Sequence, residues 1–180
     1  MILVLCGTNR KNNKSSIISR YVYNHIKNNI KTEEVKHLSL EDLPPTLNLH
    51  DIYDAEKMST EWINIQEEYI LPTTKWIVVS PEYNGTFPGI LKLFIDIISM
   101  RKYKESFAGK KALLIGVAGG RAGNLRGMEQ LTGFFNYLKI HVFPEKLPVS
   151  SVDSLINENG DIDNSTTTTI DDLVSRFIQG

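Results

Sequence analysis

One buried strand that leads directly into a polar loop constrains this chain most. Apolar residues Trp76–Val79 end at Ser80-Pro81, and Pro88-Gly89 then opens an apolar helix. A strand that is apolar at consecutive positions is buried on both faces, as in a parallel sheet covered by helices. Ligands of such sheets lie beyond the carboxyl ends of the strands. The intervening segment Glu82–Gly85 is therefore expected at a ligand site.

Strand-like runs alternate with segments of helical period along the chain. The expected strands are Ile2–Cys6, Val35–Leu40, Trp76–Ser80, Ala112–Ala118 and Ile140–Phe143. Apolar stripes at helical spacing lie within residues 18–30, 58–69, 125–138 and 170–178. This alternation predicts an α/β fold: a doubly wound, five-stranded parallel sheet of order 2-1-3-4-5 with helices on both faces. We expect residues 1–180 to form a single domain.

Composition excludes several classes of function. A formal net charge of −1 over 180 residues gives no general attraction to nucleic acid or membranes. The one cysteine, Cys6, excludes an internal disulfide and fits a reducing compartment. No apolar run approaches the ~20 residues of a membrane helix, and the first strand begins at Ile2 without a signal segment. We therefore expect a cytoplasmic protein. The four histidines are scattered, so no metal site is expected.

The loop after the first strand, Gly7–Ser16, has the features of an anion site. A helix starts near its end, and the free N–H groups and dipole of a helix N-terminus attract anions. The loop lacks both Gly-x-x-x-x-Gly-Lys-Ser and Gly-x-Gly-x-x-Gly, so one terminal monophosphate fits better than a dinucleotide pyrophosphate. The alternative is a polar capped loop with solvated basic residues. The candidate ligands are Thr8, Arg10, Asn13, Lys14, Ser15 and Ser16.

The loop after the third strand suits a planar heterocycle. Tyr83 offers a flat face, Asn84 offers a donor and an acceptor, and Gly85 allows close backbone approach. The alternative is a simple turn before the next helix.

A third loop, residues 116–124, follows the fourth strand and holds four glycines in eight residues. It is either a second place of close backbone approach or a flexible connection. In a sheet of order 2-1-3-4-5, the loops after strands one, three and four meet at the same edge. Their joint position favours a ligand site there.

Five stretches carry a resemblance to a known family. They read Gly7-Thr8-Asn9-Arg10 with Ser15, Pro81-Glu82-Tyr83-Asn84-Gly85, Leu91-Lys92-x-x-Ile95-Asp96, Phe107-x-Gly109-Lys110 and Gly119-Gly120-x-x-Gly123. From Met1 to about Val149 the chain resembles the NAD(P)H-dependent FMN reductase family, which has the flavodoxin-like fold and includes chromate, azo-dye and quinone reductases.

The resemblance implies a cofactor, a reaction and a set of site residues. FMN would be held by its phosphate in the first loop, with the Pro-Glu-Tyr-Asn loop along the ribityl and ring and the glycine loop at the ring's other edge. NADPH or NADH would pass a hydride to the flavin, which would then reduce a small acceptor (flavin, quinone, azo compound or metal oxyanion) in ping-pong order. The flavin carries the chemistry, so no catalytic side chain is expected. The implied cofactor-binding residues are Thr8, Arg10, Asn13, Lys14, Ser15, Ser16, Pro81, Glu82, Tyr83, Asn84, Gly85, Gly119, Gly120 and Gly123.

Two other functions share this topology. A flavodoxin-type electron carrier exchanges electrons only with protein partners, but such carriers tend to be strongly acidic with few basic residues in the first loop. The net charge of −1 and the basic residues of loop 10–14 argue against it. A receiver domain needs acidic residues at the end of strand one, where this chain has Cys6-Gly7-Thr8.

The helix Gly89–Ser99 predicts self-association. It is apolar around most of its circumference, and an exposed apolar face requires a partner. The resemblance points the same way, so we expect a homodimer or homotetramer. The alternative is a helix buried under the chain's own loops. The residues expected to be divided between core and interface are Leu91, Phe94, Ile95 and Ile98.

Overall fold

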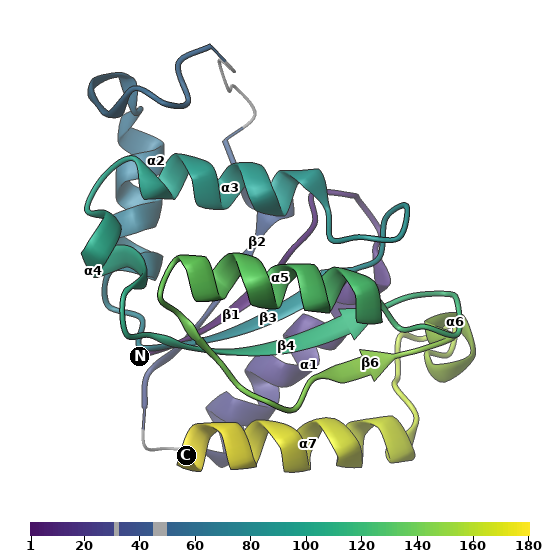
Figure 1. Ribbon diagram of the computed structural model, residues 1–180. Helices are drawn as coiled ribbons and strands as arrows, with labels where there is room; N and C mark the ends of the chain where they lie inside the picture. The colour runs from purple at the N-terminus through teal and green to yellow at the C-terminus, as the bar shows by residue number, and fades with distance from the viewer. Residues whose placement is uncertain (31–32, 45–49) are drawn as a thin grey trace.

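The computed structural model describes residues 1–30, 33–44 and 50–180. The described strands form one parallel sheet of order β2-β1-β3-β4-β5, and a further strand, β6, also pairs with β4. The predicted sheet order is confirmed, and helices lie on both faces of the sheet (Figure 1). The strands are β1 (Ile2–Cys6), β2 (Val35–Ser39), β3 (Lys75–Pro81), β4 (Lys111–Val117), β5 (His141–Val142) and β6 (Leu147–Val149).

The edge of the sheet beside β4 differs from the predicted single strand at 140–143. His141 of β5 pairs with Lys111, and Leu147 of β6 pairs with Ile115. The edge chain thus advances six residues while β4 advances four, which leaves two extra residues in a bulge. Pro144 lies in this stretch and has no amide hydrogen for a ladder bond. After the bulge, β6 continues the edge to the carboxyl end of β4.

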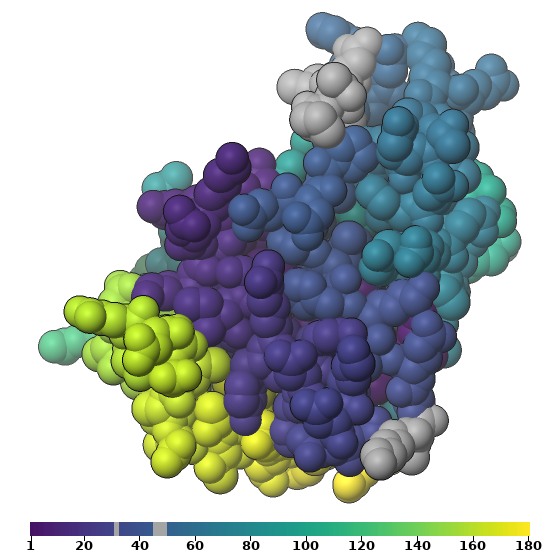
Figure 2. All heavy atoms as spheres, turned by 180° about the vertical axis from the view of Figure 1, so that it is seen from behind, coloured from purple at the N-terminus to yellow at the C-terminus, as the bar shows by residue number. Residues whose placement is uncertain are grey.

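Alternate side chains of each central strand enter opposite cores. On β3, Trp76 and Val78 belong to one apolar cluster, whereas Ile77 and Val79 belong to the other. Helices α3 and α5 cover the first cluster, and α1 and α7 cover the second. Seen from behind, α1 (purple) and α7 (yellow) lie in the lower part of the molecule (Figure 2). The helices are α1 (Lys14–Asn29), η1 (Leu40–Asp42), η2 (Ala55–Lys57), α2 (Thr60–Ile65), η3 (Gln66–Ile70), α3 (Gly89–Ser99), α4 (Tyr103–Phe107), α5 (Leu125–Tyr137), α6 (Val152–Leu155) and α7 (Asn164–Gln179).

The helix expected within residues 58–69 is present as α2 and η3 but buries a different face. Trp62 is buried as expected, whereas the next buried positions are Gln66 and Ile70 in a π-helical turn. The Gln66 amide nitrogen donates to the carbonyl of Ile98 at 2.9 Å, at the end of α3. The apolar pattern of the sequence could not predict this buried face, because the residue at its centre, Gln66, is polar.

Helix α3 has the predicted bounds, but its packing corrects one expectation. All four residues expected to be shared with an interface are buried by their own chain, with exposed fractions of 0–1%. They therefore belong to the core alone. The apolar side chains of α3 that stay half-buried are Ile90 and Leu93.

Candidate functional site

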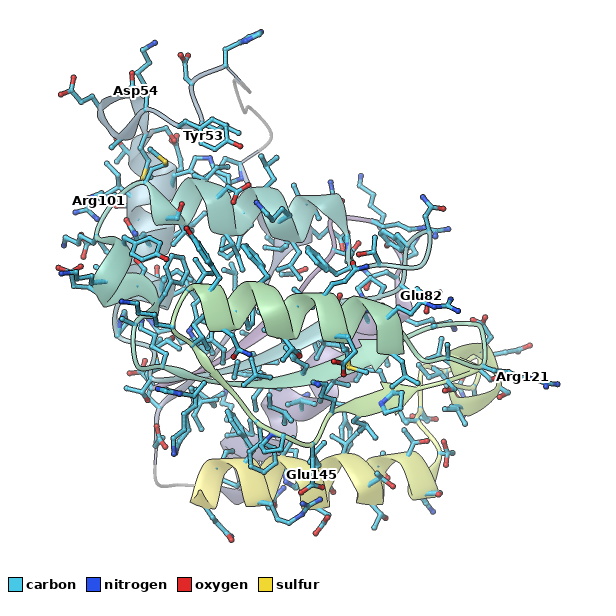
Figure 3. All side chains as sticks on the ribbon, viewed as in Figure 1. Tyr53, Asp54, Glu82, Arg101, Arg121 and Glu145 are labelled. Carbon is cyan, nitrogen blue, oxygen red and sulfur yellow. The ribbon has the colours of Figure 1, made fainter. Side chains whose placement is uncertain are left out.

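The loops after β1, β3 and β4 meet at the carboxyl edge of the sheet and enclose a cavity of about 310 Å³. Figure 3 shows Glu82 and Arg121 at this end of the molecule. The predicted cofactor residues that line the cavity are Arg10, Asn13, Lys14, Ser15, Pro81, Glu82, Tyr83 and Gly119. The predicted residues outside its lining are Thr8, Ser16, Asn84, Gly85, Gly120 and Gly123.

The start of α1 leaves one buried hydroxyl without a partner. Asn13 caps the helix by accepting a hydrogen bond from the Ser16 amide at 2.7 Å, and the Ser16 hydroxyl donates to the Asn13 carbonyl at 2.8 Å. Both side chains therefore hold the loop in shape. The Ser15 hydroxyl oxygen is buried and has no hydrogen-bond partner among the described residues, although Ser15 lines the cavity.

An anion fits this end of the cavity. The first N–H groups of a helix have no acceptor within the helix, and the dipole favours negative charge there. A phosphate oxygen would satisfy the Ser15 hydroxyl, whose burial without a partner otherwise costs free energy. Arg10 and Lys14 line the same cavity and supply positive charge.

Thr8 acts behind the cavity. It is fully buried, and its hydroxyl lies 2.7 Å from the hydroxyl of Tyr83. The amide of Arg10 also donates to the Thr8 hydroxyl oxygen at 3.2 Å. Thr8 thus joins the first loop to the loop after β3, and Tyr83 lines the cavity.

The second loop combines a cavity wall and a tight turn. The amides and carbonyls of Tyr83 and Thr86 exchange hydrogen bonds of 2.9 and 3.2 Å. Between them Asn84 has φ 53° and Gly85 has φ 80°, as a type I′ turn requires. Asn84 is exposed at the tip. Asn84 and Gly85 thus form the turn, whereas Pro81–Tyr83 line the cavity, where the role predicted for them in ligand binding stays a prediction.

The glycines of the third loop serve different purposes. Gly119 lines the cavity, and a Cβ placed there would lie 3.1 Å from an oxygen of Asp153. Gly123 has φ 53°, and a Cβ there would lie 2.6 Å from Pro148 of β6. Gly123 is therefore needed for packing against the sheet edge, not for the cavity.

Sequence reasoning missed part of the lining. Val152 and Asp153 reach the cavity from α6, which follows the unpredicted strand β6. The amide of Val152 donates to the Ala118 carbonyl at 3.0 Å and fixes this segment beside the third loop. The apolar run at 147–149 was the available signal. The remaining lining residues are Asn12, Val117 and Ala118.

The other candidate chemical groups are structural. Burial raises the pKa of the Cys6 thiol at the end of β1, which disfavours the reactive thiolate form. Among residues 1–30, 33–44 and 50–180, no group of three or more histidines, cysteines or acidic residues could hold a metal ion.

None of the helices in the same ranges is both long and apolar enough to cross a membrane.

The sheet order and the cavity at its switch point define a flavodoxin-like α/β protein. The family described as NADPH-dependent FMN reductase matches residues 1–153, and the chain belongs to this family. The description of the family names FMN as the flavin and NADPH as the reductant.

Relatives agree with this assignment. A 2-hydroxy-1,4-benzoquinone reductase from Burkholderia sp. is 31% identical over 87 residues, 48% of this chain and 48% of the relative. An NAD(P)H-dependent FMN reductase from Pseudomonas aeruginosa is 30% identical over 114 residues, 62% of this chain and 57% of the relative. The matches thus span about half the length of these relatives. The solved structure of FerB, an NAD(P)H:(acceptor) oxidoreductase from Paracoccus denitrificans, shares the fold with a TM-score of 0.77 at 20% identity, covering 99% of this chain and 94% of that one.

Proposed function

We propose that this chain is an FMN-dependent NAD(P)H oxidoreductase that reduces a small acceptor: free flavin, a quinone, an azo compound or a metal oxyanion. One observation carries the proposal. The buried Ser15 hydroxyl has no partner among the described residues, and it lies at a helix N-terminus in the same cavity as Arg10, Lys14 and Tyr83. This arrangement suits a phosphate next to an aromatic wall.

Each part of the cavity has a role in this proposal. Ser15 and the first amides of α1 would bind the phosphate of FMN, and Arg10 and Lys14 would balance its charge. Pro81–Tyr83 would line the remainder of the cofactor. Gly119 has no side chain, so the backbone of the loop after β4 would lie close to the cofactor there.

The protein supplies binding and orientation, and FMN when bound supplies the capacity to accept a hydride and to deliver two electrons. The overall change is NAD(P)H, a proton and the oxidised acceptor giving NAD(P)⁺ and the reduced acceptor. We propose that reductant and acceptor use the site in turn, which gives ping-pong kinetics. Neither a nucleophile nor a protein acid is needed for the hydride transfer.

Flavin binding tests the proposal. The purified protein should be yellow, or should bind FMN much more tightly than riboflavin. Arg10→Ala and Ser15→Ala should weaken FMN strongly and riboflavin little, because riboflavin has no phosphate. Lys11→Ala is the matched control, since Lys11 is an exposed basic residue of the same loop outside the cavity lining. Equal losses for both flavins would refute the phosphate assignment.

Steady-state kinetics separate the enzyme from a flavodoxin-type carrier. An oxidoreductase turns over NAD(P)H with an artificial acceptor, and its double-reciprocal plots are parallel if the order is ping-pong. A carrier binds FMN but oxidises NAD(P)H only when a protein partner is added.

The proposal includes self-association through α3 and α5. Phe87 and Phe134 stack with ring centroids 6.3 Å apart, and they are half-buried like Ile90 and Leu93. Tyr137 at the end of α5 is 79% exposed. A second copy of the chain would remove this apolar surface from water.

A further inference from the structure

A single buried side chain joins the glycine loop to the end of β3. Asn124 precedes α5 and is fully buried. Its amide nitrogen donates to the carbonyl of Ser80 at 2.9 Å and to the carbonyl of Pro81 at 3.0 Å. Its side-chain oxygen is buried and has no partner among the residues that the structure describes.

The backbone of Asn124 shows that this contact replaces an ordinary helix cap. An Asn before a helix normally accepts a hydrogen bond from an amide of the first turn. Asn124 instead has φ 66° and ψ 29°, in the left-handed region, and makes no capping bond. Asn tolerates this conformation better than most residues. The Asn124 side chain thus bonds to β3 and leaves the N-terminus of α5 without a side-chain cap.

Two glycines provide the space that Asn124 occupies. A Cβ at Gly116 of β4 would lie 3.0 Å from the Cβ of Asn124 and 2.2 Å from the carbonyl oxygen of Gly123. A Cβ at Gly127, in the first turn of α5, would lie 2.1 Å from the side-chain oxygen of Asn124. A glycine inside a helix lowers stability by about 1 kcal/mol relative to alanine. The helix has glycine at position 127 because the Asn124 side chain occupies the space of a Cβ there.

The two carbonyls that Asn124 holds lead directly into the cavity wall. Pro81 is the last residue of β3 and lines the cavity, as do Glu82 and Tyr83. The Glu82 amide donates to the carbonyl of Val117 at 3.0 Å, so the segment is fixed to β4 on one side and by Asn124 on the other.

We propose that Asn124 is a positioning residue for the cofactor site: by holding the Ser80 and Pro81 carbonyls, it sets where Glu82 and Tyr83 stand against the bound flavin. The inference rests on the proposed function. It differs from the phosphate assignment because Asn124 acts on the part of the cavity that FMN and riboflavin would share.

Two variants test the role of Asn124. Asn124→Gly keeps the left-handed backbone and removes the amide, and Asn124→Asp keeps the shape but places a carboxylate oxygen opposite the two carbonyls. Loss of two hydrogen bonds should weaken FMN and riboflavin alike, by about tenfold. The midpoint potential of the bound flavin should also shift. In the flavin-free protein, hydrogen exchange of the Glu82 and Tyr83 amides should become faster.

Two controls separate positioning from general destabilisation. Lys139→Gly changes an exposed left-handed residue after α5, with φ 64°. Phe177→Leu weakens the α7 core on the opposite face of the sheet. Neither should alter flavin affinity or exchange at Glu82. A lower melting temperature in both Asn124 variants, with unchanged flavin affinity, potential and exchange, would overturn the inference. Wild-type protein that binds neither flavin would overturn the proposed function instead, and the exchange rates would still decide the positioning role.

Discussion

The hydroxyl groups of Thr8 and Tyr83, 75 positions apart in sequence, lie 2.7 Å from each other. The Thr8 oxygen also accepts a hydrogen bond from the Arg10 amide, and between Thr8 and Tyr83 either hydroxyl can be the donor. If Thr8 donates, the Tyr83 proton remains free for a ligand in the cavity. This bond makes the aromatic wall of the candidate site depend on the loop that binds the phosphate in our proposal.

Removing either hydroxyl should weaken the site to a similar extent. We expect Tyr83→Phe and Thr8→Val each to raise the Kd for FMN about fivefold, the equivalent of one hydrogen bond. Since the two groups share one bond, the double variant should lose little more than either single variant. Fluorescence titration of the flavin measures all four values. Fully additive losses would contradict the coupling.

The turn at Asn84-Gly85 allows its two possible roles to be separated. Asn84→Gly should keep the positive φ, and Asn84→Ala should strain it by about 1 kcal/mol. If Asn84 serves the turn alone, only the alanine variant changes flavin affinity and potential. If its amide contacts the flavin ring, both variants shift the potential. Potentiometry of the two holoproteins distinguishes the outcomes.

The sheet was predictable because its strands are apolar at consecutive positions. Trp76–Val79 is buried on both faces, and such a short apolar run between polar turns is typical of a central strand in a covered parallel sheet. The edge was less predictable because only five residues of β5 and β6 pair with β4, on either side of a bulge. Two of the cavity residues, Val152 and Asp153, were missed for the same reason.

Within the loops, the sequence indicated most of the residues that line the cavity but not which contacts each side chain makes. Ser15 and Ser16 are chemically identical, yet the Ser16 hydroxyl is bonded to the Asn13 carbonyl and the Ser15 hydroxyl is not. Which serine faces the cavity depends on where α1 starts, and Asn13 determines that position. Asn124 gave no sequence signal because its partners are main-chain carbonyls 43 and 44 positions away.

Two glycines in α5 should respond to alanine in opposite directions. At Gly127 a Cβ would lie 2.8 Å from the amide nitrogen of Phe87 as well as against Asn124, so Gly127→Ala should destabilise the fold by about 2 kcal/mol. At Gly133 nothing lies within 4 Å of an added Cβ. Gly133→Ala should therefore stabilise the fold by about 0.5–1 kcal/mol. Urea unfolding of both variants tests this, and equal effects would contradict the packing around Asn124.

An ion pair near the N-terminus should contribute to stability in a pH-dependent way. Burial acts to raise the pKa of Glu33, but the hydrogen bond and charge of Lys75, at 2.6 Å, and the charge of the N-terminus outweigh it and lower the pKa. A carboxyl group with a lowered folded pKa stabilises the fold above its unfolded pKa of about 4.3, and this contribution disappears as the pH falls through the folded pKa.

Glu33→Gln should therefore cost about 1 kcal/mol at pH 7, and this cost should disappear as the pH falls through the folded pKa. Urea unfolding at several pH values measures the difference between variant and wild type. Glu158→Gln, in the exposed loop before α7, makes the same substitution away from this ion pair and serves as the control. A difference that is constant with pH would show that Glu33 acts through packing and not through its charge.

Self-association should depend on the outer surface of α3 and α5, not on the α3 residues in the core. Leu93 is a half-buried apolar residue of α3, so an arginine there would put a charge into any interface that this helix forms. We expect wild-type protein to have at least twice the 20.4 kDa mass of one chain in light scattering at micromolar concentration, and Leu93→Arg to have the mass of one chain. Tyr53→Arg is the control: Tyr53 is 64% exposed and lies on the loop before α2, away from α5 (Figure 3). A wild-type monomer that binds FMN and turns over fully would refute the proposed self-association.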